Sequence, residues 1–514
     1  MLVKTFGSTI YGVKAIIITA EVSVESGVSF NLVGLPDNAV KESQQRIEAA
    51  LKYSGYTMPK RKIVINMAPA DIRKEGSAYD LTLAIGILAA SEQVNHQDLH
   101  KYLIMGELSL DGSLQPIKGA LPIAIEARAN GFEGFILPKE NAREAAIVND
   151  LKVYGANSMR EVADFLNGNL DLTPVEVDTR KEFFGATNTF NVDFREIRGQ
   201  ESAKRAMEVA AAGGHNILMV GPPGSGKTML AQRIPTIMPP LSLKESLETT
   251  KLYSIMGKLS ENQSLLTTRP FVSPHHTISN VALVGGGSTP HPGEISLAHN
   301  GVLFLDEFPE FKREALEVLR QPLEDRVVTI SRSTYRVEYP ASFMLVAAMN
   351  PCPCGHYTDP NNPCTCSEHA IANYLKKISG PLLDRIDIQI EVLPVSNKEL
   401  TSAPSSSENS STMRERILHA RQMQENRFKG EDGIHCNAQM TPRLIEEHCQ
   451  LSKENKQMIE HAITQMKLSA RAYSRILKVA RTVADLNLSD SILPIHLAEA
   501  IQYRSLDRGS WGRK

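Results

Sequence analysis

The sequence has few of the features that mark secreted or membrane-bound proteins. Only six cysteines occur in 514 residues, too few for a disulfide framework in a chain of this length. No apolar run approaches the roughly 18 residues that a membrane span needs, and the first such run, residues 15–20, ends at Glu21. We therefore expect a protein of the reducing cytoplasm with no membrane partner.

An excess of charge of one sign is also missing. Lys and Arg total 56 and Asp and Glu total 58, which gives a formal net charge of -2. This balance excludes a globally basic protein, so any contact with DNA must come from local basic patches. Hydrophobic residues make up 42% of the chain, which is enough for large buried cores. At roughly 150 residues per domain, the length suggests about three compact units.

Polar stretches divide the chain into blocks. A first block ends near Pro174, and a second ends near residue 395. Residues 401–412 form a low-complexity stretch rich in serine, which cannot bury enough apolar surface to order itself. We predict domains at residues 1–174 and 175–395, a flexible linker at 396–412, and a domain at 413–508 whose apolar residues recur at helical spacing.

The strongest motif is a complete G-x-x-x-x-G-K-[ST] sequence at residues 221–228. It follows an apolar run, residues 217–220, and precedes a helical segment, which is the strand-loop-helix context of a P-loop. Backbone N–H groups and the helix N-terminus then surround phosphate oxygens. We expect Lys227 to reach the β- and γ-phosphates of ATP and Thr228 to bind Mg²⁺. The predicted nucleotide-binding residues are Gly221, Pro222, Pro223, Gly224, Ser225, Gly226, Lys227 and Thr228.

Two further apolar runs end in polar side chains. Residues 301–305 are followed by Asp306 and Glu307, an arrangement that puts Asp306 in the Mg²⁺ shell and Glu307 beside the attacking water. Residues 343–349 are followed by Asn350, whose amide can orient water or the γ-phosphate. The alternative for Asn350 is a turn-forming residue before Pro351.

Together with residues 379–387, these motifs resemble those of AAA+ ATPases of the magnesium-chelatase and MCM branch. The resemblance extends through residues 471–486, and the chain is identified as a member of the YifB/ComM family of magnesium-chelatase-like ATPases. It implies an α/β fold in which an AAA+ P-loop core carries inserted β-hairpins and is followed by a C-terminal helical lid.

The resemblance also implies catalytic residues and an assembly. Asn350 is then sensor 1, and Arg385 is an arginine finger that acts on the nucleotide of a neighbouring subunit, which requires a ring, here a homo-hexamer. Arg471 is sensor 2, with Arg475 as the alternative. A cation at the γ-phosphate stabilises the charge on its oxygens during transfer. The alternative role of Arg385 is an intrachain salt bridge to Asp384 or Asp387.

Residues 105–119, with the segments 123–129 and 134–141, resemble the Lon-protease-like α/β domain of the ribosomal S5 domain 2-like fold. Ser77 lies near the position of the nucleophilic serine of that family. Leu121, however, occupies the position of the family's catalytic lysine, and Lys118 lies one helical turn before that position. Without a basic partner, Ser77 has no activating group. We predict a structural or partner-binding domain, with cryptic proteolysis as the alternative.

Two insertions in the predicted core are candidates for contact with DNA. The glycine-rich residues 284–290 lie where the resembling branch carries a hairpin that faces the ring pore. Alternation predicts a second hairpin, residues 326–331 and 335–339, whose basic and aromatic residues are Arg326, Arg332, Arg336 and Tyr335. Such a finger can track a nucleic-acid backbone. The alternative is a solvated hairpin whose arginines pair with Glu324, Asp325 and Glu338.

Four of the six cysteines form two C-x-C pairs shortly after Asn350: Cys352, Cys354, Cys364 and Cys366. Four thiolates can hold a tetrahedral structural Zn²⁺, and the loop between the pairs has no core of its own. Because C-x₂-C is the commoner zinc spacing, free thiols and a redox role remain alternatives. We predict that Cys436 and Cys449 are ordinary packing residues.

The combined prediction is an ATP- and Mg²⁺-dependent hexameric motor that acts on single-stranded or branched DNA through hairpins in its pore. Similarity to ComM-type members points to a helicase that promotes branch migration in recombination or natural transformation. One alternative is a metal-insertion ATPase, as in magnesium chelatase subunit I, although we expect that subunit to lack an N-terminal block of this kind. A second alternative is an ATPase that remodels proteins or degrades them. Leu121, which replaces the catalytic lysine of the protease family, argues against this alternative.

Overall fold

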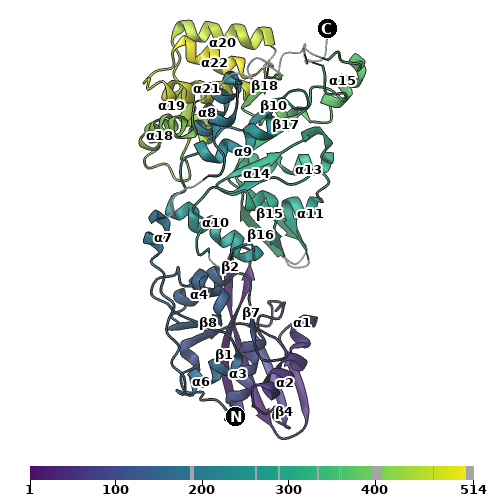
Figure 1. Cartoon of the computed structure of the whole chain (residues 1–514), viewed down its shortest axis with the longest axis vertical. Coiled ribbons are helices and arrows are strands. Elements are labelled where there is room, and N and C mark those ends of the chain that lie inside the picture. The colour runs from purple at the N-terminus through teal and green to yellow at the C-terminus, as the bar shows by residue number, and fades with distance from the viewer. Residues whose placement is uncertain are drawn as a thin grey trace.

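The computed structural model describes residues 1–185, 190–260, 263–287, 290–332, 335–357, 359, 362–395, 408–466 and 468–504, without the side chains of Arg332 and Tyr335. The molecule is elongated, with the N-terminal region at one end and the C-terminal helices at the other (Figure 1). Among the described residues, no helix is both long enough and apolar enough to cross a bilayer.

The N-terminal region is built on a seven-stranded mixed sheet in the order β3-β4-β2-β1-β5-β8-β9. Its strands are β1 (Leu2–Tyr11), β2 (Lys14–Glu25), β3 (Ser29–Val33), β4 (Lys62–Ala68), β5 (Tyr102–Ile104), β8 (Gly134–Pro138) and β9 (Lys152–Ala156). Buried and less buried residues alternate along β4, as expected for a strand that has one face on a core.

Six helices accompany this sheet: α1 (Asn38–Lys41), α2 (Ser43–Tyr53), α3 (Asp80–Ala90), α4 (Ala120–Ala129), α5 (Lys139–Ala145) and α6 (Met159–Leu166). Every residue of α3 is buried, which fits its almost wholly apolar sequence. A short hairpin, β6 (Glu107–Leu108) and β7 (Leu114–Gln115), completes the region.

The middle region contains a five-stranded sheet in the order β11-β14-β17-β10-β18, and all of its pairs are parallel. The strands are β10 (Ile217–Val220), β11 (Phe271–Val272), β14 (Val302–Leu305), β17 (Met344–Met349) and β18 (Ile388–Glu391). β10, β14 and β17 are buried throughout, which explains why their sequences are continuous apolar runs.

The helices of the middle region are α7 (Thr179–Gly185), α8 (Glu201–Gly213), α9 (Lys227–Ile237), α10 (Leu243–Met256), α11 (Asn280–Val284), α12 (Glu294–Leu297), α13 (Arg313–Val318), α14 (Arg320–Asp325), α15 (Glu368–Leu375) and α16 (Gly380–Leu383). With the two sheets they confirm the predicted α/β class.

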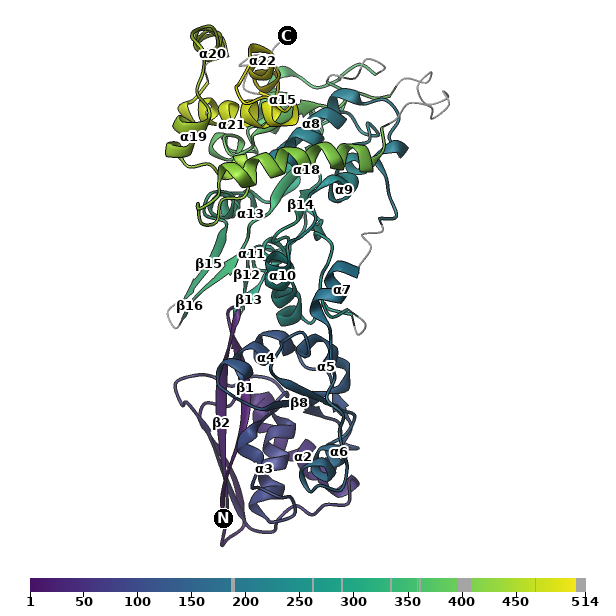
Figure 2. The ribbon, with the colours of Figure 1, turned by 90° about the vertical axis from the view of Figure 1, so that its left-hand side faces the viewer.

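Two antiparallel hairpins lie where the sequence predicts insertions. β12 (Gly285–Gly286) pairs with β13 (His291–Pro292), and β15 (Val327–Arg332) pairs with β16 (Tyr335–Pro340). Residues 288–289 and 333–334, which come between the paired strands in the sequence, lie outside the described ranges. In Figure 2 the β15–β16 hairpin extends away from the five-stranded sheet toward the N-terminal region.

The C-terminal helices are α18 (Ser410–Arg427), α19 (Pro442–His448), α20 (Lys453–Met466), α21 (Ala470–Leu486) and α22 (Pro494–Gln502). Most of the predicted linker, residues 396–407, lies outside the described residues, and its last residues already form the first turn of α18, which is capped by Asn409. Apolar residues of α18, α21 and α22 share one buried cluster with α8, α9 and β10. The C-terminal helices therefore pack on the P-loop region through a continuous core.

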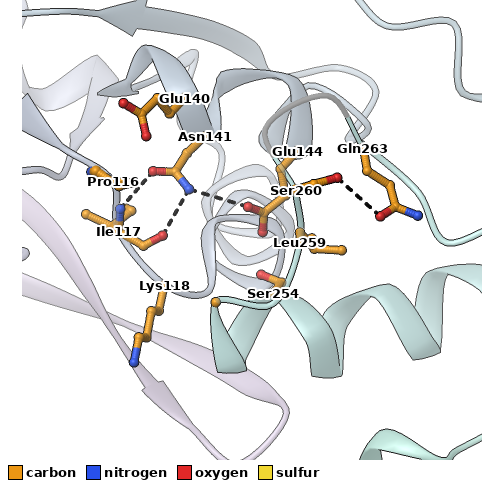
Figure 3. A pocket seen from close by; sticks show the side chains of 11 residues that line it. Pro116, Ile117, Lys118, Glu140, Asn141, Glu144, Ser254, Leu259, Ser260 and Gln263 are labelled. Carbon is orange, nitrogen blue, oxygen red and sulfur yellow. Dashed lines mark hydrogen bonds between the residues drawn. The ribbon is translucent and has the colours of Figure 1, made fainter. Parts of the chain in front are cut away.

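The N-terminal region meets the middle region along α10. The N–H of Gly119 donates to the carbonyl of Ser254 over 3.0 Å. A cavity of about 240 Å³ lies at this seam, and Figure 3 shows Asn141 held by the Ile117 backbone beside Glu144. Burial raises the pKa of Glu144, whose carboxylate accepts the N–H of Leu121 over 2.9 Å. A backbone hydrogen bond thus crosses the seam, and a buried polar network of the N-terminal region lies beside it.

Candidate nucleotide site

The P-loop lies between β10 and the N-terminus of α9. Gly224 and Gly226 have φ angles of 76° and 89°, which a residue with a side chain rarely adopts, so the loop needs glycine there. Gly226 is also the N-cap of α9, and the helix begins at Lys227. The unsatisfied N–H groups of this first helical turn face the loop, as an anion site requires.

Residues that follow four of the parallel strands line one open cavity of about 700 Å³, and residues 273–276, which follow β11, are among them. The P-loop follows β10, Asp306 and Glu307 follow β14, and Asn350 follows β17. The structure therefore brings together the sequence-predicted residues Lys227, Thr228, Asp306, Glu307 and Asn350 at the carboxyl edge of the sheet. This edge is where open parallel sheets bind their ligands.

Lys227 is positioned for phosphate. Its Nζ donates to the carbonyls of Gly221 and Pro222 over 2.7 and 2.9 Å, and it lies 3.4 Å from Oδ1 of Asn350. Burial lowers the pKa of Lys227, because the charged ammonium is partly removed from water. A phosphate group in the cavity would offer this ammonium the negative charge that two carbonyls do not supply.

The two predicted Mg²⁺ ligands are in direct contact. Oγ1 of Thr228 donates to Oδ2 of Asp306 over 2.8 Å, so both oxygens can face one cation, and hydroxyl and carboxylate oxygens are the donors that Mg²⁺ prefers. The donor set of the cavity fits ATP and Mg²⁺: backbone N–H groups and an ammonium for phosphates, and two oxygens for the cation.

Glu307 has a left-handed backbone, with φ 51°, which is unusual for a residue with a side chain and is typical of functional sites. Its carboxylate lies 3.0 Å from Nδ1 of His276, which lines the same cavity with Ser273, Pro274 and His275. The sequence analysis missed this segment. It follows β11 at the same edge of the sheet, but this strand has only two residues, so no continuous apolar run marks it in the sequence.

The three arginines that were predicted to act on the nucleotide, Arg385, Arg471 and Arg475, lie at the opposite edge of the sheet. Arg385 comes just before β18, which pairs in parallel with β10, whereas the P-loop follows the other end of β10. Its buried guanidinium contacts Glu324, with Nη2 and Oε1 2.5 Å apart, and donates to the carbonyl of Pro381 over 2.6 Å. The partner is therefore neither Asp384 nor Asp387.

Arg471 and Arg475 belong to the same cluster. The hydrogen bond from Arg385 lowers the pKa of Glu324, and the charges of Arg471 and Arg475 lower it further. Arg475 also forms an ion pair with buried Asp387; although burial opposes the effect, this guanidinium holds the pKa of Asp387 well below its usual range. Arg471 is exposed, whereas Arg475 has a structural partner.

The hairpin arginines are only partly free. Arg336 is 71% exposed, and its Nη2 lies 3.0 Å from Oε1 of Glu338, which is one of the three pairings considered from sequence. Arg326 donates to Oγ of Ser342 over 3.1 Å. The side chains of Arg332 and Tyr335 lie outside the described residues.

In the N-terminal region, Ser77 donates a hydrogen bond to the carboxylate of Glu107. Ser77, Glu107 and Lys118 line a cavity of about 450 Å³, and Leu121 is fully buried. The nearby Lys74 donates to the carbonyl of Pro69. Among the described side chains, the hydrogen-bond partner of Ser77 is thus a carboxylate and not an amine.

The four clustered cysteines can also hold a metal. Their Sγ atoms all lie within 4.8 Å of one another, although they come from two segments of the chain. Cys436 and Cys449 are separate and buried, which agrees with their predicted packing role.

Comparison with known proteins covers nearly the whole chain. The family model for magnesium chelatase, subunit ChlI, matches residues 193–400, a model for subunit ChlI of Mg-chelatase matches residues 20–141, and the model for the ChlI C-terminal part matches residues 407–504. A shorter similarity, 28% identity over 155 residues covering 28% of the chain, is to Lon protease 2 of Bacillus subtilis.

Relatives that match over nearly their whole length have a higher sequence identity to this chain. YifB of Salmonella typhimurium is 43% identical over 499 residues, which cover 97% of this chain and 96% of its own. Competence protein ComM of Haemophilus influenzae is 44% identical over 501 residues, with the same two coverages. The chain therefore belongs to the YifB/ComM family of magnesium-chelatase-like AAA+ ATPases.

Proposed function

We propose that this protein is a cytoplasmic, hexameric motor that hydrolyses ATP and acts on DNA, as a helicase that promotes branch migration. The observation that carries the ATPase part is the single cavity in which the P-loop, Thr228, Asp306, Glu307 and Asn350 converge. Lys227 holds the phosphates, Thr228 and Asp306 hold Mg²⁺, and Asn350 acts as sensor 1. Glu307 orients the attacking water.

The position of the arginines supports a ring. β10 has four residues and separates the two edges of the sheet by about 13 Å, so Arg385 faces away from the P-loop of its own chain. A second copy, packed head-to-tail, brings this edge against a neighbour's cavity. Glu324, its intrachain partner, is 47% exposed, whereas the guanidinium of Arg385 is buried, so the finger role requires Arg385 to leave this carboxylate for the phosphate oxygens of the neighbouring chain's nucleotide. Arg385 is then the finger and Arg471 is sensor 2.

The proposed layout assigns residues 1–174 to a Lon-protease-like domain without peptidase activity, 175–395 to the AAA+ core, 396–412 to a linker and 413–508 to the lid. The hydrogen bond from Ser77 to Glu107 supports the lack of activity, because the negative carboxylate disfavours ionisation of the serine hydroxyl, whereas the lysine of a Ser-Lys pair would favour it.

Action on DNA rests on the relative named competence protein ComM and on the β15–β16 hairpin, which projects from the core and carries exposed Arg336. A metal-insertion ATPase is the second candidate, because all three family models are named for a chelatase subunit. The N-terminal region does not argue against it, since a model with that name matches residues 20–141.

The test measures ATP turnover with and without single-stranded and forked DNA at low salt, with Lys227→Ala as the blank. We expect DNA to bind and to stimulate turnover several-fold. A matched pair of variants localises the effect: Arg336→Ala removes an arginine that is 71% exposed and ion-paired, and Arg160→Ala removes one that is 70% exposed and ion-paired on α6. Only the first should weaken stimulation. DNA that neither binds nor stimulates refutes the helicase proposal and leaves the ATPase proposal intact.

A further inference from the structure

The Sγ atoms of four clustered cysteines have the spacing of the ligands in a tetrahedral metal site. The residues are Cys352, Cys354, Cys364 and Cys366. Three of the Sγ–Sγ distances are 3.3, 3.7 and 3.6 Å. Four sulfurs at a Zn–S distance of about 2.3 Å in a tetrahedron lie about 3.8 Å apart. The sulfurs are thus close to the required positions, and the weak hydrogen bonds between thiols are a poor reason for four of them to converge.

Backbone N–H groups point at these sulfurs. The N–H of Cys354 donates to Sγ of Cys366, and the N–H of Cys366 donates to Sγ of Cys364, each over 3.4 Å. Such bonds favour the thiolate, which is the form that binds a metal. The first pair is also closed by a tight turn, in which the N–H of Gly355 donates to the carbonyl of Cys352 over 3.0 Å.

This turn packs on the nucleotide site. Gly355 has φ 86°, and a Cβ at this position would lie 2.7 Å from Cδ of Pro223 in the P-loop and 4.0 Å from the amide carbon of Asn350. Cys352 follows Asn350 by two residues and is fully buried. The turn that carries the first two cysteines therefore contacts the P-loop, and it closely follows the sensor residue in the chain.

We propose that the cysteine cluster binds one Zn²⁺ per chain and that this metal holds Asn350 and Pro223 in the geometry that ATP hydrolysis needs. The cluster lies in a loop whose described residues contribute only Cys352 to the hydrophobic core, so the four metal bonds replace side-chain packing as its support. The effect on turnover rests on the proposed ATPase function, whereas the metal site does not.

The first measurement is the metal content of the purified full-length protein by mass spectrometry, without chelators. We expect one zinc per chain in the wild type and in Cys436→Ser and Cys449→Ser, which change buried cysteines outside the cluster. The Cys364→Ser/Cys366→Ser double variant should lose the zinc. A wild-type protein without zinc, or with iron at this site, overturns the proposal.

The second measurement tests the coupling in wild-type protein. Zinc is removed with a chelator, and ATP turnover is followed together with binding of a fluorescent ATP analogue. We expect kcat to fall at least about tenfold, because the sensor amide is no longer fixed, and to recover on adding Zn²⁺ alone. Unchanged kcat after complete removal contradicts the coupling. A wild type that binds zinc but never hydrolyses ATP instead refutes the proposed function.

A pair of glycine variants separates packing from metal binding. Gly355→Ala introduces a methyl group against Pro223, while Gly430→Ala introduces one at a similar φ, 96°, with no atom within 4 Å. We expect both variants to keep zinc and only Gly355→Ala to lose turnover. Equal turnover in the two variants contradicts the claim that the cluster acts through its contact with the P-loop.

Discussion

At the carboxyl edge of the five-stranded sheet, the P-loop, Asp306 and Asn350 line one open cavity. At the opposite edge, Arg385 and its neighbours surround Glu324 and Asp387. Among the described residues, the cavity at the first edge has donors for phosphate and oxygens for Mg²⁺ but is lined by no arginine, and the cluster at the second edge has arginines but no P-loop. The difference suggests that one complete catalytic site requires both edges, from two chains.

The largest effect is expected at the first edge. Lys227→Ala removes the ammonium that contacts the loop carbonyls and Asn350, and because both binding and transfer lose this charge, turnover should fall by more than about 1,000-fold. Binding of a fluorescent ATP analogue should weaken in the same variant. Near-normal hydrolysis in this variant would place the catalytic site elsewhere and remove the basis of the comparison.

The second edge should behave differently. Arg385→Ala is expected to lower kcat about 1,000-fold while it leaves ATP binding almost unchanged, because the proposed finger acts on the nucleotide of a neighbouring chain only during transfer. Equilibrium binding and single-turnover hydrolysis measure the two quantities separately. Lost binding would mean that Arg385 acts within its own chain and would break the contrast between the edges.

Arg475→Ala should act on stability instead of catalysis. It leaves the buried carboxylate of Asp387 without its ion-pair partner, which costs about 3 kcal/mol in the free energy of unfolding. Denaturant unfolding measures this loss. If the unfolding midpoint were unchanged and hydrolysis were lost, Arg475 and not Arg471 would be sensor 2.

The smallest effect is expected for Arg471→Ala. Because Arg471 is exposed, its removal should leave the unfolding midpoint unchanged, and kcat should fall about tenfold through weaker stabilisation of the phosphate charge. Parallel turnover and unfolding experiments check both statements. A lower midpoint with normal turnover would show that Arg471 only supports the cluster around Glu324.

The predicted residues of the first edge were readable from sequence because the P-loop, Asp306 and Asn350 each directly follow a continuous apolar strand. Lys227, Asp306 and Asn350 end up together since parallel strands end at the same side of a sheet. The strands themselves could be predicted because β10, β14 and β17 are buried on both faces and carry no polar interruption.

The contacts of the second edge could not be read in the same way. Glu324 lies on α14, far from Arg385 in the sequence, and nothing in the local pattern indicates that they meet. His276 reaches the cavity from a segment without regular structure, and the packing of Gly355 on Pro223 depends on a tertiary contact between two loops. Residue type predicted the chemistry of these positions, and only the fold determined their partners.

Mixing two inactive variants tests the central claim most directly. Lys227→Ala keeps the second edge intact, and Arg385→Ala keeps the first, so a mixed ring contains interfaces in which both edges are functional. After dissociation and reassembly at equal amounts, random mixing should restore about one quarter of wild-type turnover. Mixed assemblies that remain inactive at every ratio would show that each chain hydrolyses ATP with its own residues and would contradict a site shared between chains.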